Sequence, residues 1–288
     1  ADLNPNLART DTFTPTMPHW YNAAGIAYDR ELAAVYHKER LPNYGVFDES
    51  RYFKPGDLQH VYIIGGAKVG ISICEDIWYP NGPVAIQSRD GADLILNINA
   101  SPFQAGKMDQ RTDMLSRRAT ENGVFIAYLN AVGGQDELVF DGGSMLFGPT
   151  GELIARGSQF REELMMVDIE INESSPIIET TDSLMTETNM KMISGYTNVP
   201  NRPVIPSIEP TEYTNIGEIY AALVLGTHDY VHKCNFDKVL VALSGGIDSS
   251  LVATIAVDAL GSKKVVGVSM PSQFSSASSV SDAQSLAH

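Results

Sequence analysis

The chain has 288 residues, of which 43% are apolar and 19% charged, and this composition is typical of one or two globular domains. Its 35 acidic and 20 basic side chains give a net charge of −15. This charge argues against a nucleic-acid partner, because phosphate backbones attract basic surfaces. No apolar run approaches the roughly 20 residues that span a membrane, so we expect no membrane partner either.

The two cysteines, Cys74 and Cys234, fall in segments that we assign to different domains. A disulfide between them is therefore not expected, and free thiols favour a reducing, cytoplasmic location.

The first half of the chain alternates strand-like apolar stretches with turns. It predicts two hairpins, 21–28 with 32–36 and 59–64 with 67–73, the second around Gly65 and Gly66. Further along it predicts, in order, a strand at 94–99, a helix at 109–122 ended by Gly123, a strand at 124–130, strands at 142–147 and 152–155, and a closing segment at 164–171. This mixture indicates sheets covered by helices.

The strand at 69–73 leads directly into Cys74 and a polar turn. A thiol at a strand end is accessible to a substrate, and a nearby cation can lower its pKa, which favours the nucleophilic thiolate. Lys38 also follows directly on a strand. On its own, such a cysteine is most often a small buried hydrophobic residue, and a lysine at a strand end is most often a solvated surface charge. Together they predict that Cys74 is more reactive than Cys234.

The periodicity disappears between residues 173 and 215, where prolines punctuate a polar stretch. We interpret these residues as an interdomain linker between domains at 1–172 and 216–288. Part of it could lie on a domain surface through the apolar residues Met185, Met190, Met192 and Ile193.

After a helix at 216–231, a buried strand at 238–243 enters a Ser-Gly-Gly-Ile-Asp-Ser turn that opens into a helix at 251–260. Glycines allow positive φ and close backbone approach, and a helix N-terminus carries partial positive charge, so this turn predicts a phosphate cradle. It lacks the Gly-Lys-Ser/Thr of a Walker loop. Asp248 is placed to hold Mg²⁺ on the phosphates. A second strand at 264–270 completes a βαβ unit.

These residues resemble two known families. Ser244 to Ser249 is similar to the Ser-Gly-Gly-x-Asp-Ser signature of the ATP pyrophosphatases, and the Lys38 and Cys74 segments resemble the nitrilase, or carbon–nitrogen hydrolase, superfamily with its Glu-Lys-Cys triad. Joined in this order, and with segments 41–49 and 270–276, they resemble the glutamine-dependent NAD synthetases. The resemblance implies an α/β fold, with a nitrilase-like α-β-β-α sandwich followed by the start of a doubly wound parallel domain.

The resemblance also implies roles for particular residues. Cys74 would attack the side-chain amide of glutamine, with Lys38 beside it and Glu49 as a supporting carboxylate. Glutamine would be held by Tyr44, Ser101 and Lys107. ATP would be cradled by Ala242, Leu243, Ser244, Gly245, Gly246, Ile247, Asp248 and Ser249, with Mg²⁺ on Asp248. Ammonia would then displace AMP from adenylated nicotinic acid adenine dinucleotide, in a homo-oligomeric enzyme.

The chain departs from the family pattern at one position. The family's general-base glutamate lies before the first hairpin, and no glutamate precedes Glu31 here. We therefore expect a portion of a longer bifunctional enzyme, without glutaminase turnover of its own. Two other interpretations stay open: a different amidotransferase with the same two parts, distinguished by the acyl acceptor that triggers pyrophosphate release, or a non-catalytic remnant that serves as a binding module.

Overall fold

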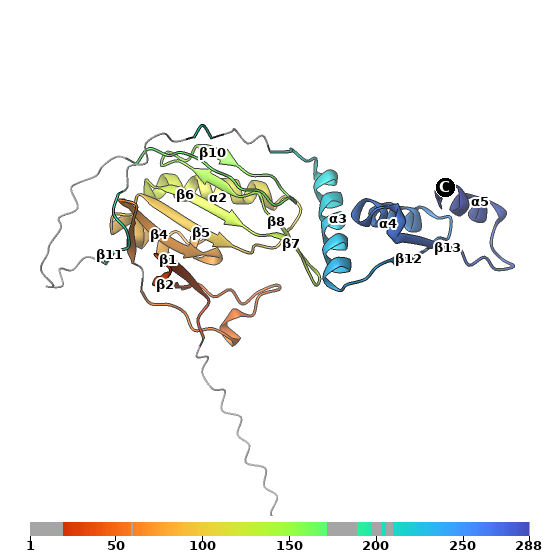
Figure 1. The fold of residues 1–288 in the computed structure, drawn as a ribbon, viewed down its shortest axis with the longest axis horizontal. Coiled ribbons are helices and arrows are strands. Elements are labelled where there is room, and N and C mark those ends of the chain that lie inside the picture. The colour runs from red at the N-terminus through yellow and green to blue at the C-terminus, as the bar shows by residue number, and fades with distance from the viewer. Residues whose placement is uncertain (1–19, 59, 172–188, 197–202, 206–209, 288) are drawn as a thin grey trace, which may run out of the picture.

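The computed structural model describes residues 20–58, 60–171, 189–196, 203–205 and 210–287. These residues form a larger body and a smaller one, with the long helix α3 (Asn215–Lys233) between them (Figure 1).

A seven-stranded sheet in the order β10-β9-β6-β5-β4-β3-β11 forms the centre of the larger body. Its middle strands β4 (Ala67–Ile73), β5 (Leu94–Asn99) and β6 (Phe125–Asn130) are parallel. Their apolar residues alternate onto both faces, the pattern expected of a sheet with layers on both sides. The remaining strands are β3 (Val61–Ile64), β9 (Met145–Phe147), β10 (Leu153–Arg156) and β11 (Met190–Met192).

Helices cover one face of this sheet and a hairpin covers part of the other (Figure 1). On the first face, α1 (Pro83–Arg89) and α2 (Lys107–Asn122) enclose a core that includes Ile95, Leu115 and Ile126. On the opposite face, the hairpin of β1 (Ala23–Tyr28) and β2 (Glu31–His37) packs on side chains of β3 and β4. The described residues therefore supply a helix layer, the main sheet and a second β layer, in the order of the expected sandwich.

Most of the predicted elements are present with small shifts at their ends. Both early hairpins form, although Gln59 lies outside the described residues. Helix α2 ends as predicted, because Gly123 adopts the left-handed conformation (φ 63°) that caps a helix. Residues 164–171 have no regular structure.

Two elements of the larger body were not predicted from the sequence. Helix α1 spans only seven residues, too few to establish a helical period. The hairpin of β7 (Val132–Gln135) and β8 (Leu138–Asp141) contains Gly133 and Gly134, which weaken a strand pattern.

Part of the expected linker belongs to the main sheet. Met190–Met192 form β11, which pairs in parallel with β3, and Met190 packs against the core. Met185, another expected anchor, lies outside the described residues.

The smaller body is a βαβ unit with a further helix. Strands β12 (Val239–Ala242) and β13 (Val265–Val268) are parallel and are connected by α4 (Ile247–Leu260), and α5 (Ala277–Ala287) follows. A small apolar cluster holds the unit together; it consists of Val241, Leu243, Ala253, Ala256 and Ala283.

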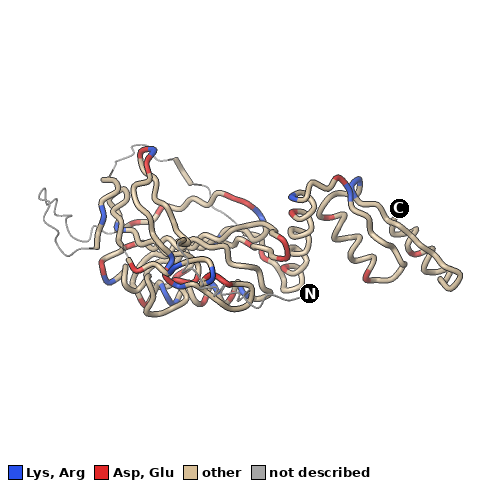
Figure 2. The backbone as a smooth tube through the Cα atoms, turned by 90° about the horizontal axis from the view of Figure 1, so that it is seen from below, with Lys and Arg blue, Asp and Glu red and all other residues tan. Residues whose placement is uncertain are grey.

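Helix α3 contacts both bodies, packing on β7 and β8 on one side and on α4 on the other. Its first turn is capped by Thr214, whose side chain accepts a hydrogen bond from the backbone N–H of Gly217 at 3.1 Å. Along the described chain, Lys and Arg are interspersed with Asp and Glu (Figure 2). Within the described residues, none of the helices has the length and apolar character needed to cross a membrane.

Removing a side chain from β5 should lower the free energy of unfolding by different amounts on the two faces of the strand. Ile95 is fully buried beneath the helices, so Ile95→Ala should lower the free energy of unfolding by about 2–5 kcal/mol. Ile98 points to the other face and is 42% exposed, so Ile98→Ala should cost at most about 1 kcal/mol. Urea unfolding measures both, and equal costs would contradict this orientation of the strand.

Candidate functional site

Cys74 lies at the point where β4 ends and a short 3₁₀ helix, Cys74–Ile77, begins. Its φ of 46° is in the left-handed region, where a side chain other than glycine costs about 1–3 kcal/mol. A buried hydrogen bond helps to hold this turn: the Asp76 carboxylate accepts the backbone N–H of Ile73 at 2.9 Å.

The same carboxylate ties the Cys74 turn to the end of β2. Asp76 is fully buried and accepts the Tyr36 hydroxyl at 2.8 Å and the backbone N–H groups of Glu39 and Arg40 at 3.2 and 2.7 Å. Burial raises the pKa of Asp76, and the hydrogen bond from Arg40 acts against that rise. Because Glu39 and Arg40 directly follow Lys38, this network sets where Lys38 stands relative to Cys74.

Lys38 is almost fully buried and forms a two-point ion pair with Glu49. Its ammonium donates to the two Glu49 carboxylate oxygens at 2.7 and 2.8 Å. A buried charge needs such a partner, because the cost of removing it from water is otherwise uncompensated. Glu49 therefore holds Lys38 in place, and the supporting role that the family resemblance implies for it stays a prediction.

The thiol of Cys74 is less ionised than the sequence suggested. Burial raises its pKa; the Lys38 cation lowers it, and the carboxylates of Glu75 and Glu49 add to the rise. Cys234, at the C-terminal end of α3, is exposed. The expectation that Cys74 is the more reactive of the two thiols stays a prediction, and the desolvation of Cys74 acts against it.

The residues predicted to hold a small substrate gather around Cys74. The Tyr44 hydroxyl donates to both carboxylate oxygens of Glu75 at 2.9 Å, and its pKa is raised to about 12 by burial and by that bond. The Lys107 ammonium donates to the Pro102 carbonyl at 3.3 Å, and burial lowers its pKa, with the charge of Arg111 adding to this effect. Both Tyr44 and Lys107 are near enough to the Cys74 thiol to interact with it electrostatically.

Glu75 was missed by the sequence reasoning. It is buried, next to Cys74 in the chain, and the acidic pair that follows the cysteine was the available signal. Besides the Lys38–Glu49 pair, Glu75 and Lys107 thus give the surroundings of Cys74 one more anionic and one more cationic group. This combination suits the ammonium and carboxylate of an amino acid.

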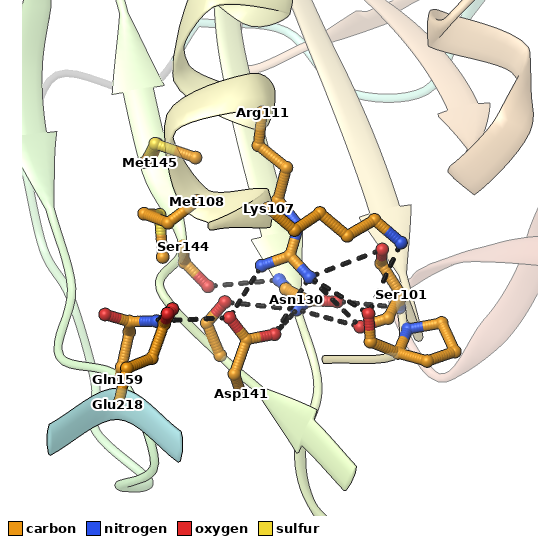
Figure 3. Close-up of polar contacts among 12 residues, drawn as sticks. Ser101, Lys107, Met108, Arg111, Asn130, Asp141, Ser144, Met145, Gln159 and Glu218 are labelled. Atoms are coloured by element: carbon orange, nitrogen blue, oxygen red, sulfur yellow. Dashed lines mark hydrogen bonds and ion pairs between the residues drawn. The ribbon is translucent and has the colours of Figure 1, made fainter. Parts of the chain in front are cut away.

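A buried ion pair between Arg111 and Asp141 lies beside Ser101 (Figure 3). The Arg111 guanidinium donates to the two oxygens of Asp141 at 2.8 and 2.9 Å, and to the backbone and side-chain oxygens of Ser101 at 3.3 and 3.4 Å. Arg111 stands four residues after Lys107 and hence on the same face of α2. That spacing was the signal that could have identified it.

The second predicted site is the turn between β12 and α4. Gly245 has φ 78°, and a Cβ there would come within 2.1 Å of the Ser279 carbonyl oxygen of α5, so only glycine fits. The Ser249 hydroxyl accepts the backbone N–H of Ser244 at 3.3 Å and donates to the Gly246 carbonyl at 3.0 Å. These bonds fold the turn over the start of α4. The predicted set from Ala242 to Ser249 thus lies in one strand-end turn.

Asp248 stands in the exposed first turn of α4. No group of three or more His, Cys, Asp or Glu side chains with metal-binding placement occurs among the described residues. Mg²⁺ is commonly held by one or two carboxylates together with phosphate oxygens and water. A single carboxylate next to the predicted phosphate-binding turn would fit that mode.

The charges around Cys74 predict how it reacts with iodoacetamide. Its alkylation rate should rise with pH through a midpoint above that of a free thiol, because its pKa is raised. Lys38→Met should slow alkylation further, since it removes the cation that lowers the pKa. Mass spectrometry across a pH series, in a Cys234→Ser background, gives the rates.

Lys38→Met leaves the Glu49 carboxylate without its ion-pair partner, and the double variant Lys38→Met/Glu49→Gln is the control for this effect. Its alkylation rate should lie between those of the Cys234→Ser protein and Lys38→Met, because it also removes a carboxylate that raises the thiol pKa. A Lys38→Met rate equal to that of the Cys234→Ser protein would contradict the electrostatic role of Lys38.

Comparisons with known proteins agree with this division into two parts. A family model for carbon-nitrogen hydrolases matches residues 12–178, and one for NAD synthase matches residues 219–288. The glutamine-dependent NAD(+) synthetase of Thermotoga maritima is 46% identical over 93% of this chain and 47% of its own length. That of Aquifex aeolicus is 43% identical over 93% of this chain and 48% of its own length.

A solved structure is similar in both sequence and fold. The glutamine-dependent NAD+ synthetase of Acinetobacter baumannii, in complex with ADP, is 37% identical with a TM-score of 0.74, over 92% of this chain and 45% of that one. The chain spans about half the length of the curated relatives that it matches. Since the first family model covers more than half of its residues, the chain belongs to the carbon-nitrogen hydrolase family, here joined to an NAD synthase segment.

Proposed function

We propose that this chain carries the glutaminase site and the ATP-binding turn of a glutamine-dependent NAD synthetase. The observation that carries the proposal is the convergence of Lys38, Glu49, Glu75, Tyr44 and Lys107 on one cysteine. The relatives that match both parts of the chain bear that name, which supports the proposal.

Glutamine fits the charges of the site. Its α-carboxylate pairs with Lys107, whose ammonium donates a 3.3 Å bond to the Pro102 carbonyl, and its α-ammonium pairs with Glu75 and the Tyr44 oxygen. Ser101 stands beside them at the start of the loop that leads into α2. Held at both charged groups, the substrate extends its side-chain amide towards Cys74.

The chemistry at Cys74 is an acyl transfer in two steps. Its thiolate attacks the amide carbon, the tetrahedral intermediate releases ammonia, and water hydrolyses the resulting thioester to glutamate. The Lys38 cation offsets the negative charge that develops on the amide oxygen. Since burial keeps the thiol protonated at rest, a general base has to remove its proton. Glu49 is occupied by Lys38, and Glu75 by Tyr44, so we assign neither of them that role.

The turn between β12 and α4 is proposed to bind the phosphates of ATP. Backbone N–H groups at the start of α4, the Ser244 and Ser249 hydroxyls and the glycines at 245 and 246 form the cradle. Mg²⁺ on Asp248 would offset the charge of the leaving pyrophosphate. Ammonia then displaces AMP from adenylated nicotinic acid adenine dinucleotide. The expected homo-oligomer and cytoplasmic location stay predictions.

Glutamine should protect Cys74 from alkylation in the Cys234→Ser protein, since the bound amide lies against the thiol. Lys107→Met should raise the half-protecting concentration by about tenfold or more, the loss of one charged contact. Lys263→Met, an exposed lysine of the smaller body, is the control and should leave it unchanged. D-Glutamine should protect poorly, because its ammonium and carboxylate exchange places. Equal protection by both isomers would argue against this binding mode.

Asp248→Asn should remove the dependence of pyrophosphate binding on Mg²⁺ while leaving metal-free binding intact. Calorimetric titration with pyrophosphate, with and without Mg²⁺, measures both affinities. In the complete synthetase that we propose, the same substitution should lower ammonia-dependent synthesis by about 10²-fold, since the leaving group loses its charge stabilisation. Glutamine hydrolysis should continue. Full ammonia-dependent synthesis in the variant would show that this turn is not the phosphate site.

A further inference from the structure

Helix α3 is the element through which the two bodies meet, and its first turn points at the glutamine-binding end of the larger body. Glu218, in that turn, is only 6% exposed. Its carboxylate accepts the backbone N–H of Gly106 at 3.3 Å and the side-chain amide of Gln159 at 3.0 Å. Both donors are neutral. An apolar side chain there would leave both donors without this acceptor, so the buried glutamate ties α3 to two separate segments of the larger body.

The first contact of Glu218 acts on Lys107. Gly106 is the N-cap of α2 and has φ 76°, and Lys107 is the first residue of that helix. A carboxylate bonded to the Gly106 N–H anchors the Ala105–Gly106 peptide, one residue before the backbone from which the Lys107 side chain leaves. Lys107 is the group that we assign to the α-carboxylate of glutamine.

The second contact of Glu218 leads to Ser101 (Figure 3). The Gln159 amide that donates to Glu218 also donates to Asp141 at 3.3 Å. Asp141 holds Arg111 at 2.8 and 2.9 Å, and Arg111 in turn contacts the backbone and side-chain oxygens of Ser101. An unbroken chain of hydrogen bonds therefore runs from α3 to the substrate-binding loop.

An aromatic contact accompanies this polar chain. Phe160, adjacent to Gln159, packs edge-on against Phe103 and Tyr213, with ring centroids 5.5 and 5.6 Å apart. Phe103 lies in the loop between Ser101 and Lys107, and Tyr213 precedes Thr214, the N-cap of α3. Two independent sets of contacts thus join the same loop to the same helix.

We propose that Glu218 is a positioning residue through which helix α3 of the NAD synthase segment sets the affinity of the glutamine subsite, by orienting Lys107 and Ser101. This inference rests on the proposed function, because it assigns a control element to that glutamine site. Glu218 touches neither the substrate nor Cys74. Its effect is therefore mainly on binding, and it reaches the thiol only through the charge of Lys107.

The test is protection of Cys74 from iodoacetamide by L-glutamine, with the whole 288-residue chain in a Cys234→Ser background. Glu218→Ala should raise the half-protecting concentration about tenfold, while the alkylation rate without glutamine changes much less. Glu218→Gln keeps the size and one acceptor oxygen, so it should give a smaller rise. Gln159→Ala should give a comparable rise, and the double variant Glu218→Ala/Gln159→Ala should add less than the sum, because both residues act through one path.

Two control variants separate this relay from loss of α3 packing. Glu212→Gln changes an exposed carboxylate paired with Arg156 close to the same helix. Asp229→Asn weakens the other anchor of α3, the 2.7 Å bond that Asp229 accepts from the Gly134 N–H. Neither should alter protection, and thermal unfolding of every variant establishes that it is folded.

Each alternative result has a distinct meaning. If L-glutamine protects the Cys234→Ser protein but Glu218→Ala leaves protection unchanged, the relay is wrong and the proposed function stands. If Asp229→Asn weakens protection as much as Glu218→Ala, the effect belongs to the docking of α3 as a whole, which also overturns the relay. If L-glutamine does not protect the Cys234→Ser protein, the proposed glutamine site fails, and the inference fails with it.

Discussion

The candidate active site depends on one buried carboxylate, that of Asp76. It accepts hydrogen bonds from the Cys74 turn and from the residues that follow Lys38, so two strand ends from different β layers are held to one point. A single acceptor with several donors can stay buried and still be satisfied. Because the nucleophile has a costly positive φ, some such network has to hold it in place. Asp76 therefore fixes the relative position of Lys38 and Cys74 through its bonds to both segments.

Around Cys74, desolvation and charge act in opposite directions. Burial raises the pKa of the thiol, the Lys38 cation lowers it, and burial prevails. A protonated thiol at rest is protected from unwanted oxidation and alkylation, since the thiolate is the reactive form. The same desolvation strengthens the interaction of Lys38 with any negative charge that develops on a bound amide. The Cys74 thiol is thus expected to ionise when a substrate and a base are present, and not to be a thiolate at rest.

The two bodies of the chain are joined by polar contacts as well as by packing. Glu218 and Asp229 of α3 each accept a hydrogen bond from a backbone N–H group of the larger body. Such directional bonds fix the rotation of a helix about its axis, which apolar packing alone specifies weakly. Since α3 also packs on α4, whose N-terminus forms the phosphate turn, one helix touches elements of both proposed sites.

The sequence by itself determined the elements whose signals are local. The strand leading to Cys74, the glycine that ends α2 and the Ser244–Ser249 turn were all predictable, because periodicity, capping and turn chemistry act within a few residues. It also identified Lys38, Glu49, Tyr44, Ser101 and Lys107 as a set, through resemblance to a family. Only the tertiary structure showed that burial outweighs Lys38 at the thiol, that residues 190–192 join the main sheet, and that Glu75, Arg111, Asp141 and Glu218 surround the site. Desolvation and long-range hydrogen bonds depend on which segments meet in space, and no local pattern of residues encodes that.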